Sequence, residues 1–251
     1  MTRTLHFLLY SAAIAFYAAL ASSAFAGPYT TNAIADVFVA TGPTGNLGNN
    51  NYGGGGALAV AASGLPNGEF QSVIKFDLTG ARDAFDAQYG VGQWSVESVS
   101  LQLSSSPHNN AIYNNVAAGV FGVSLMGNNS WTEGTGTAGI PTGDGVTFNT
   151  LQSTFISGAA DQGLGTFAFD GSTSGAHGYS LTLSPGLSAD VLAGDDASLR
   201  LFAADNSVSY LFSSRSSASS APELIVTAVP EPSCLALVAL ALGSVWLKRW
   251  Q

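Results

Sequence analysis

Charged side chains are scarce in this sequence of 251 residues, and basic ones are the scarcest. Only 9% of the residues are charged, whereas an average globular protein has about a quarter. Between residues 27 and 229, four basic side chains stand against fifteen acidic ones, which gives a net charge of 4 − 15 = −11. Such a surface repels phosphate, so we expect no nucleic acid partner and no anionic polysaccharide without a bridging cation. The four basic residues are Lys75, Arg82, Arg200 and Arg215.

Cysteine and histidine are nearly absent as well. The single cysteine, Cys234, lies near the C-terminus, so the body of the chain can form neither a disulfide nor a zinc–thiolate site. Only His108 and His177 lie in the body, and neither belongs to an H-E-x-x-H motif. A G-x-S-x-G nucleophile elbow is also missing. The sequence therefore predicts a protein that is not an enzyme, with a triad dispersed among the many Ser and Asp residues as the alternative.

No cofactor motif fits its context. Residues 134–139 read GTGTAG, but no strand precedes them and Ile140-Pro141 ends the segment, so we expect a flexible loop and no dinucleotide. The aspartates offer oxygen ligands that suit calcium, yet their spacing is not that of an EF-hand. A solvated acidic face is the favoured interpretation, and a structural calcium ion is the alternative. These aspartates are Asp36, Asp144, Asp195, Asp196 and Asp205.

The N-terminal 26 residues have the features of a secretory signal peptide. Arg3 precedes an apolar run over residues 7–20, and the A-x-A step from Ala24 to Ala26 comes directly before Gly27. A signal peptidase would therefore cut between Ala26 and Gly27. An uncleaved N-terminal membrane anchor is the alternative.

Residues 229–251 have the features of a second targeting segment, at the C-terminus. Pro230, Glu231 and Pro232 precede an uncharged run over residues 234–247, and Lys248 and Arg249 follow it. As a helix the run would be about 21 Å long, which just spans a hydrocarbon core of about 30 Å when the flanking cations reach the headgroups. The positive-inside rule places Lys248 and Arg249 in the cytoplasm and the body outside. We expect the prolines to keep the preceding segment extended and accessible to a processing enzyme.

This tail resembles a PEP-CTERM sorting signal in its Pro-Glu-Pro step, apolar helix and terminal Lys-Arg pair. The resemblance implies that a membrane enzyme of the exosortase type recognises and removes the tail. It also implies a Gram-negative host that makes exopolysaccharide. A plain C-terminal anchor is the alternative.

Short segments of alternating hydrophobicity recur between residues 27 and 228. In the segment 72–78, for example, Ile74 and Phe76 share one face while Lys75 and Asp77 share the other. Gly, Asn, Pro and Ser separate the segments, which predicts one all-β domain with the architecture of a β-sandwich. Short helices are expected at residues 81–88 and 188–192, the second ending before Gly194. The predicted strands are residues 34–39, 72–78, 99–103, 121–125, 179–183, 199–201, 208–212 and 224–226.

Most of this region resembles the DNRLRE-type domains. The resemblance rests on the segments SVIKFDL at 72–78, SWTEG at 130–134, GVTFN at 145–149 and YLFSSR at 210–215. It implies a jelly-roll β-sandwich, and some members of that family bind carbohydrate. Two positions depart from the family pattern: Ser216 replaces an acid and Phe148 replaces a tryptophan. We also expect Arg215 to be buried and to tie strands together through a carboxylate, with Glu133 or Asp77 as its partner.

Two glycine-rich loops, residues 42–56 and 127–145, are long for a compact domain, and such loops are often functional. Aromatic residues in or near Asn-rich loops can stack against sugars, which makes Tyr52, Trp94, Tyr113 and Trp131 the candidate ligand-binding residues. Each of them could equally be a structural anchor.

The sequence thus predicts an exported protein of the cell envelope, outer surface or extracellular matrix, held at the membrane by its tail until processing. Its partners would be the export machinery, an exosortase-type enzyme and exopolysaccharide. The favoured function is a non-catalytic carbohydrate-associated binding module. A purely structural or adhesive surface protein is the first alternative, and a polysaccharide-active enzyme is the second.

Overall fold

A computed structural model describes residues 27–106, 112–113, 116–217 and 220–231. The chain in these ranges is all-β, as expected, and it forms one nearly closed antiparallel sheet. The strand order is β6-β5-β8-β3-β1-β10-β4-β7, and β2 joins β3 to β9. The strands are β1 (Tyr29–Ala40), β2 (Ala57–Ala61), β3 (Phe70–Asp77), β4 (Trp94–Ser104), β5 (Gly119–Leu125), β6 (Gln162–Phe169), β7 (Ala176–Leu181), β8 (Asp196–Ala203), β9 (Ser209–Ser213) and β10 (Glu223–Pro230).

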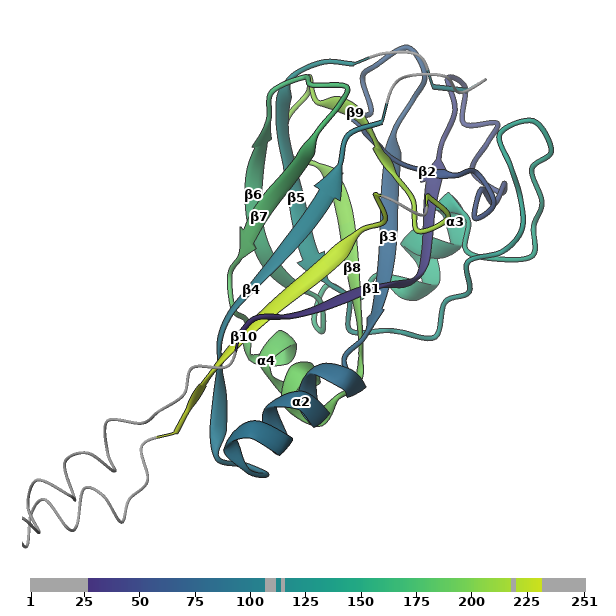
Figure 1. Cartoon of the computed structure of the whole chain (residues 1–251). Helices are drawn as coiled ribbons and strands as arrows, with labels where there is room; N and C mark the ends of the chain where they lie inside the picture. Colours follow the sequence, from purple (N-terminus) through teal and green to yellow (C-terminus); the bar gives the residue numbers. More distant parts are fainter. Residues whose placement is uncertain (1–26, 107–111, 114–115, 218–219, 232–251) are drawn as a thin grey trace, which may run out of the picture.

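Strand β1 joins the two layers of the fold. Its first residues, 29–32, pair with β10, and its last residues, 33–40, pair with β3. The register shifts between Ala33 and Ala35, and a shift of this kind bends a strand, so β1 passes from one layer to the other. Figure 1 shows it crossing the molecule in this way.

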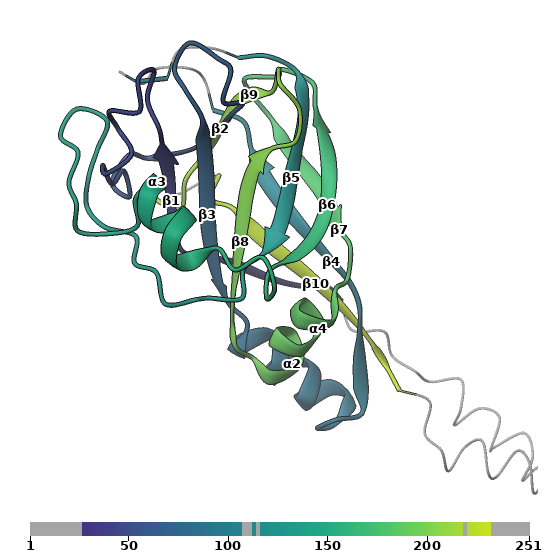
Figure 2. The same ribbon diagram turned by 180° about the vertical axis from the view of Figure 1, so that it is seen from behind.

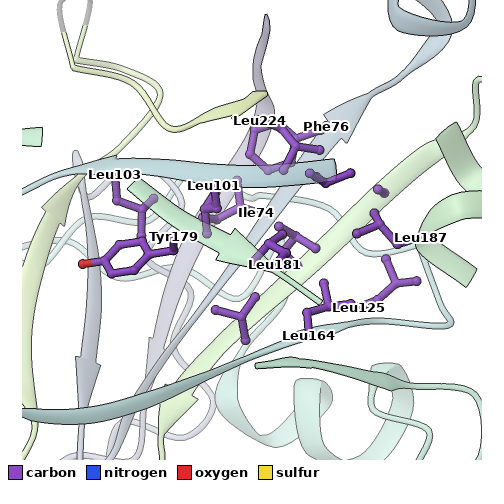
Figure 3. Close-up of a cluster of buried hydrophobic side chains, with 14 of the residues drawn as sticks. Ile74, Phe76, Leu101, Leu103, Leu125, Leu164, Tyr179, Leu181, Leu187 and Leu224 are labelled. Carbon is purple, nitrogen blue, oxygen red and sulfur yellow. The ribbon is translucent and has the colours of Figure 1, made fainter. Parts of the chain in front are cut away.

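The main core lies between the layers. Alternation places Ile74 and Phe76 of β3 opposite Leu101 and Leu103 of β4, and all four side chains are fully buried. Figure 3 shows these side chains meeting those of β7 and β10. A second apolar cluster, which includes Val39, Val73, Trp131, Val146 and Leu151, lies outside this core, so residues 126–156 cover part of one layer.

Within the described ranges, the segments that connect the strands include four helical ones: α2 (Thr79–Tyr89), α3 (Phe148–Thr150), the π-helical turn η1 (Leu151–Phe155) and α4 (Pro185–Ala193). α2 and α4 are longer than the sequence predicted. The Ser184 hydroxyl accepts from Leu187 N–H at the start of α4, and Gly194 ends that helix with a φ of 71°. Both helices lie at the end of the molecule where the described chain begins and stops (Figures 1 and 2).

Candidate functional site

The two glycine-rich loops lie against each other. Asn51 N–H donates to the Thr142 carbonyl at 2.7 Å, and Gly54 N–H donates to the Gly136 carbonyl at 2.7 Å. Asn51 and Thr142 form an isolated antiparallel bridge between loops that are about 90 residues apart in sequence. We call this contact the loop junction and define it by Asn51, Gly53, Gly54, Gly134 and Gly136.

The fully buried Asn51 side chain is the centre of the loop junction. Its amide N–H groups donate to the carbonyls of Glu133 at 2.7 Å and Val146 at 2.8 Å. Its Oδ1 accepts from Gly53 N–H at 3.0 Å and Gly136 N–H at 3.2 Å. All four hydrogen-bonding positions of the amide are therefore used inside the protein.

The glycines of the junction permit close backbone approach. A Cβ on Gly136 would lie 1.9 Å from the Asn51 carbonyl oxygen, and one on Gly53 would lie 2.2 Å from the Glu133 carbonyl oxygen. Gly134 has a φ of 77°, a backbone conformation that residues other than glycine rarely adopt. The G-x-G-x-x-G segment that was expected to be a flexible loop is instead packed at its first two glycines.

A cluster of three charged groups lies beside the junction. The Nε of Arg215 donates to both carboxylate oxygens of Glu133, at 2.9 and 3.0 Å, and Nη2 donates to Oε2. The backbone N–H of Arg215 donates to Asp36 Oδ2 at 2.6 Å. The Glu133 side chain is 16% exposed and that of Arg215 is 41% exposed. Arg215 is therefore half-exposed, whereas the sequence predicted a buried side chain.

Asp36 is the buried acid of this cluster, with 1% of its surface exposed. Burial raises the pKa of its carboxyl from 3.8 to about 7. The hydrogen bond from the Arg215 backbone N–H lowers this pKa, and so does the positive charge of the Arg215 side chain. The neighbouring Glu133 carboxylate raises it. In the sequence, Asp36 was considered only as an oxygen ligand for calcium, so its contact with Arg215 was missed.

Asp77 is not the partner of Arg215. Its Oδ1 accepts from Thr79 N–H at 2.8 Å, at the start of α2. This hydrogen bond lowers the pKa of the exposed Asp77 carboxyl.

The four candidate sugar-binding aromatics are buried, with exposed fractions of 1% for Tyr52, 3% for Trp94, 1% for Tyr113 and 2% for Trp131. Trp131 Nε1 donates to Ser198 Oγ at 2.9 Å, and the Lys75 ammonium lies 4.8 Å from its ring centre. The assignment of a sugar-stacking face to these residues was wrong, because their rings have no free face.

Interior partners account for the other three rings. Trp94 Nε1 donates to Asp86 Oδ1 at 2.8 Å. Tyr52 is stacked on Phe38, with ring centres 4.9 Å apart. The Tyr113 hydroxyl lies 2.7 Å from that of Ser209. All three are structural anchors.

The one described histidine of the body lies between two hydroxyls. His177 Nε2 is 3.1 Å from Ser105 Oγ and 3.0 Å from Ser172 Oγ. The carboxylate of Asp170 accepts from Ser172 N–H at 2.9 Å. Nδ1 of the imidazole has no hydrogen-bond partner among the described residues, so the third member of a triad is not in place there. His108 lies outside the described residues.

The aspartates considered for calcium are dispersed over separate hydrogen bonds. Asp144, for example, accepts from Thr135 N–H at 3.0 Å and from the Thr135 hydroxyl at 2.7 Å. Within the described ranges, no group of three or more His, Cys, Asp or Glu side chains is arranged to hold a metal ion.

The end of the body holds the start of the tail. Pro230 is the last residue of β10 and pairs with Trp94, and Glu231 N–H donates to the Gln93 carbonyl at 2.8 Å. The segment expected to be accessible is therefore paired with β4 up to Pro230, whereas Glu231, which bonds to the residue before β4, is exposed. Gly27 is exposed. The other predicted processing residues lie outside the described residues: Ala24, Ala26, Pro232, Lys248 and Arg249. Among the residues that the structure does describe, no helix is long and apolar enough to cross a membrane.

No protein-family model matches this chain, and no curated protein is significantly similar to it.

Proposed function

We propose that this chain is an exported, non-catalytic structural module of the cell surface or extracellular matrix. The observation that carries the proposal is the loop junction, in which the two longest loops use their polar groups on each other around Asn51. The burial of Tyr52, Trp94, Tyr113 and Trp131 supports the same interpretation, because these residues stabilise the domain and are not displayed to a ligand.

The cellular location of the module is proposed from its two terminal segments. Residues 1–26 would direct export, and residues 229–251 would act as a PEP-CTERM-like sorting tail for an exosortase-type enzyme. The body would be a DNRLRE-like jelly roll. Tyr29 pairs with Val226, so the two terminal segments join the body close together. This supports attachment of the domain by one end.

Association with exopolysaccharide is the second candidate, and the net charge of −11 favours a neutral polymer. A polysaccharide-active enzyme ranks last. The Ser–His contact at His177 is its only support among the described residues, and that contact lacks a carboxylate on the imidazole.

The test is genetic complementation in the producing cell. A deletion strain would be rescued with wild-type protein, His177→Ala or Asn51→Asp, and matrix cohesion would be measured. We expect His177→Ala to rescue fully and Asn51→Asp to fail, because only the second removes a buried structural network. Failure of a correctly folded and exported His177→Ala protein would contradict the proposal and favour catalysis.

A further inference from the structure

A small surface hollow of about 230 Å³ lies between the loop 127–145 and the helical segment 148–155. Its lining combines hydroxyls, one carboxylate and one aromatic ring. The lining side chains that matter are Ser130, Thr132, Asp144, Thr150, Thr154 and Phe155.

Phe155 is the only aromatic residue in this lining. It is half-buried and packs against the cluster that contains Trp131 and Leu151. It is also the last residue of the π-helical turn η1. Such turns are rare and occur frequently at functional sites. The ring is thus fixed from behind by apolar contacts while the residue borders the hollow.

Asp144 supplies an acceptor at the edge of the hollow. Hydrogen bonds from the hydroxyls of Thr142 and Thr135 and from Thr135 N–H lower the pKa of its carboxyl to about 2. The side chain therefore stays ionised at any physiological pH. Its Oδ1 accepts two of these bonds and its Oδ2 accepts one, so Oδ2 keeps a free position for a ligand hydroxyl.

Exposed hydroxyls provide further contacts. Ser130, Thr132 and Thr154 are all solvent-exposed. The Thr132 hydroxyl has no hydrogen-bond partner within the described part of the chain. A ligand with several hydroxyls of its own can pair with such a rim.

We propose that this hollow binds one neutral pyranose ring, with Phe155 against the apolar face of the sugar and Asp144 accepting from a sugar hydroxyl. An aromatic ring for the C–H face and a few fixed polar groups at the edge are the complement of a sugar. The acidic body disfavours a uronic acid or a phosphate. This binding gives the second candidate function, association with exopolysaccharide, a specific site, and it does not depend on the proposed structural role.

The expected affinity is low. The hollow is smaller than the roughly 300–1,000 Å³ of ordinary ligand pockets, and a single sugar ring with about twelve heavy atoms should bind with a Kd near 1 mM. Useful retention of a polymer would come from many modules acting together.

The test is saturation-transfer NMR on the full chain in a sugar-free zwitterionic detergent. The probes are the methyl glycosides of glucose, galactose and mannose at about 5 mM, several times the expected Kd. We expect transfer to at least one glycoside, strongest at the C–H protons of one face. Absence of transfer to all three would overturn the proposal.

Variants locate the binding. Phe155→Leu keeps an apolar side chain but removes the ring, and Asp144→Asn removes the charge; we expect a tenfold loss with the first and at least a threefold loss with the second. Phe202→Ala is the matched control, because this partly exposed phenylalanine contacts Arg200 away from the hollow. Transfer that survives Phe155→Leu, or that Phe202→Ala abolishes equally, would overturn the site. These results are independent of the matrix rescue, so the two proposals can fail separately.

Discussion

Asp36→Asn should change the pH dependence of stability. The folded-state pKa of Asp36 is raised from 3.8 to about 7, mainly by burial. Between these values the native state binds a proton that the unfolded state has released, so the free energy of unfolding falls as the pH rises. A shift of about 3 units at about 1.36 kcal/mol per unit corresponds to about 4 kcal/mol, present in full below pH 4 and lost by about pH 7.

The side-chain amide of the Asp36→Asn variant cannot ionise, yet its oxygen can still accept from Arg215 N–H. We therefore expect the stability of Asp36→Asn, relative to wild type, to improve by about 4 kcal/mol between pH 4 and pH 8. The assay is urea unfolding followed by tryptophan fluorescence at one-unit pH steps. Burial and Asp195 also raise the pKa of Asp190 to about 6, so only the difference between wild type and variant isolates Asp36.

Asp77→Asn is the matched control, because the pKa of the exposed Asp77 is lowered by its bond from Thr79 and any effect must have the opposite sign. A difference between wild type and Asp36→Asn that is independent of pH would refute the assignment of a buried, proton-binding Asp36.

Three further predictions concern the junction and the ion pair. Asn51→Ala should lower the free energy of unfolding by about 3 kcal/mol or more, because it removes four hydrogen bonds, two of them buried and two part-buried, and leaves their backbone groups without this partner. Asn51→Asp should lower the free energy of unfolding further, since a carboxylate cannot donate to two carbonyls. Wild-type stability of either variant in urea unfolding would contradict this. Gly136→Ala should lower the free energy of unfolding strongly, because its Cβ would collide with the Asn51 carbonyl. Gly139→Ala, whose Cβ would have nothing within 4 Å, should keep a free energy of unfolding within about 0.5 kcal/mol of wild type. Equal melting temperatures of the two variants would contradict the close packing at Gly136. A double-mutant cycle of Arg215→Ala and Glu133→Gln should give a coupling free energy of about 1 kcal/mol. This coupling should weaken in 1 M salt, because the Arg215 side chain is 41% exposed. A coupling unchanged by salt would mean that the pair is not electrostatic.

Alternation predicted most of the sheet from the sequence. The strand at residues 72–78, for example, corresponds to β3, and the segment 99–103 lies within β4. β2 and β6 were missed for a physical reason: ALAVA has no polar partner positions, and QGLGTFAF contains two glycines, which weaken a strand pattern.

The site was less predictable, because its contacts join distant segments. Glu133 was one of two candidate partners predicted for Arg215, with Asp77 as the other. Nothing local indicated that Asn51 would bond to residues more than 80 positions away. Composition also misled: glycines typical of a mobile loop permit close packing here, and Trp131 in an Asn-rich loop is an interior residue.

Amide hydrogen exchange on the full chain tests the central claim, that the two glycine-rich loops form a fixed internal structure. The N–H groups of Asn51, Gly53, Gly54 and Gly136 all donate inside the junction. We predict that these four amides exchange as slowly as those of β3, and that Asn51→Asp makes them fast. Exchange in the wild type at the rate of an open loop would contradict the account.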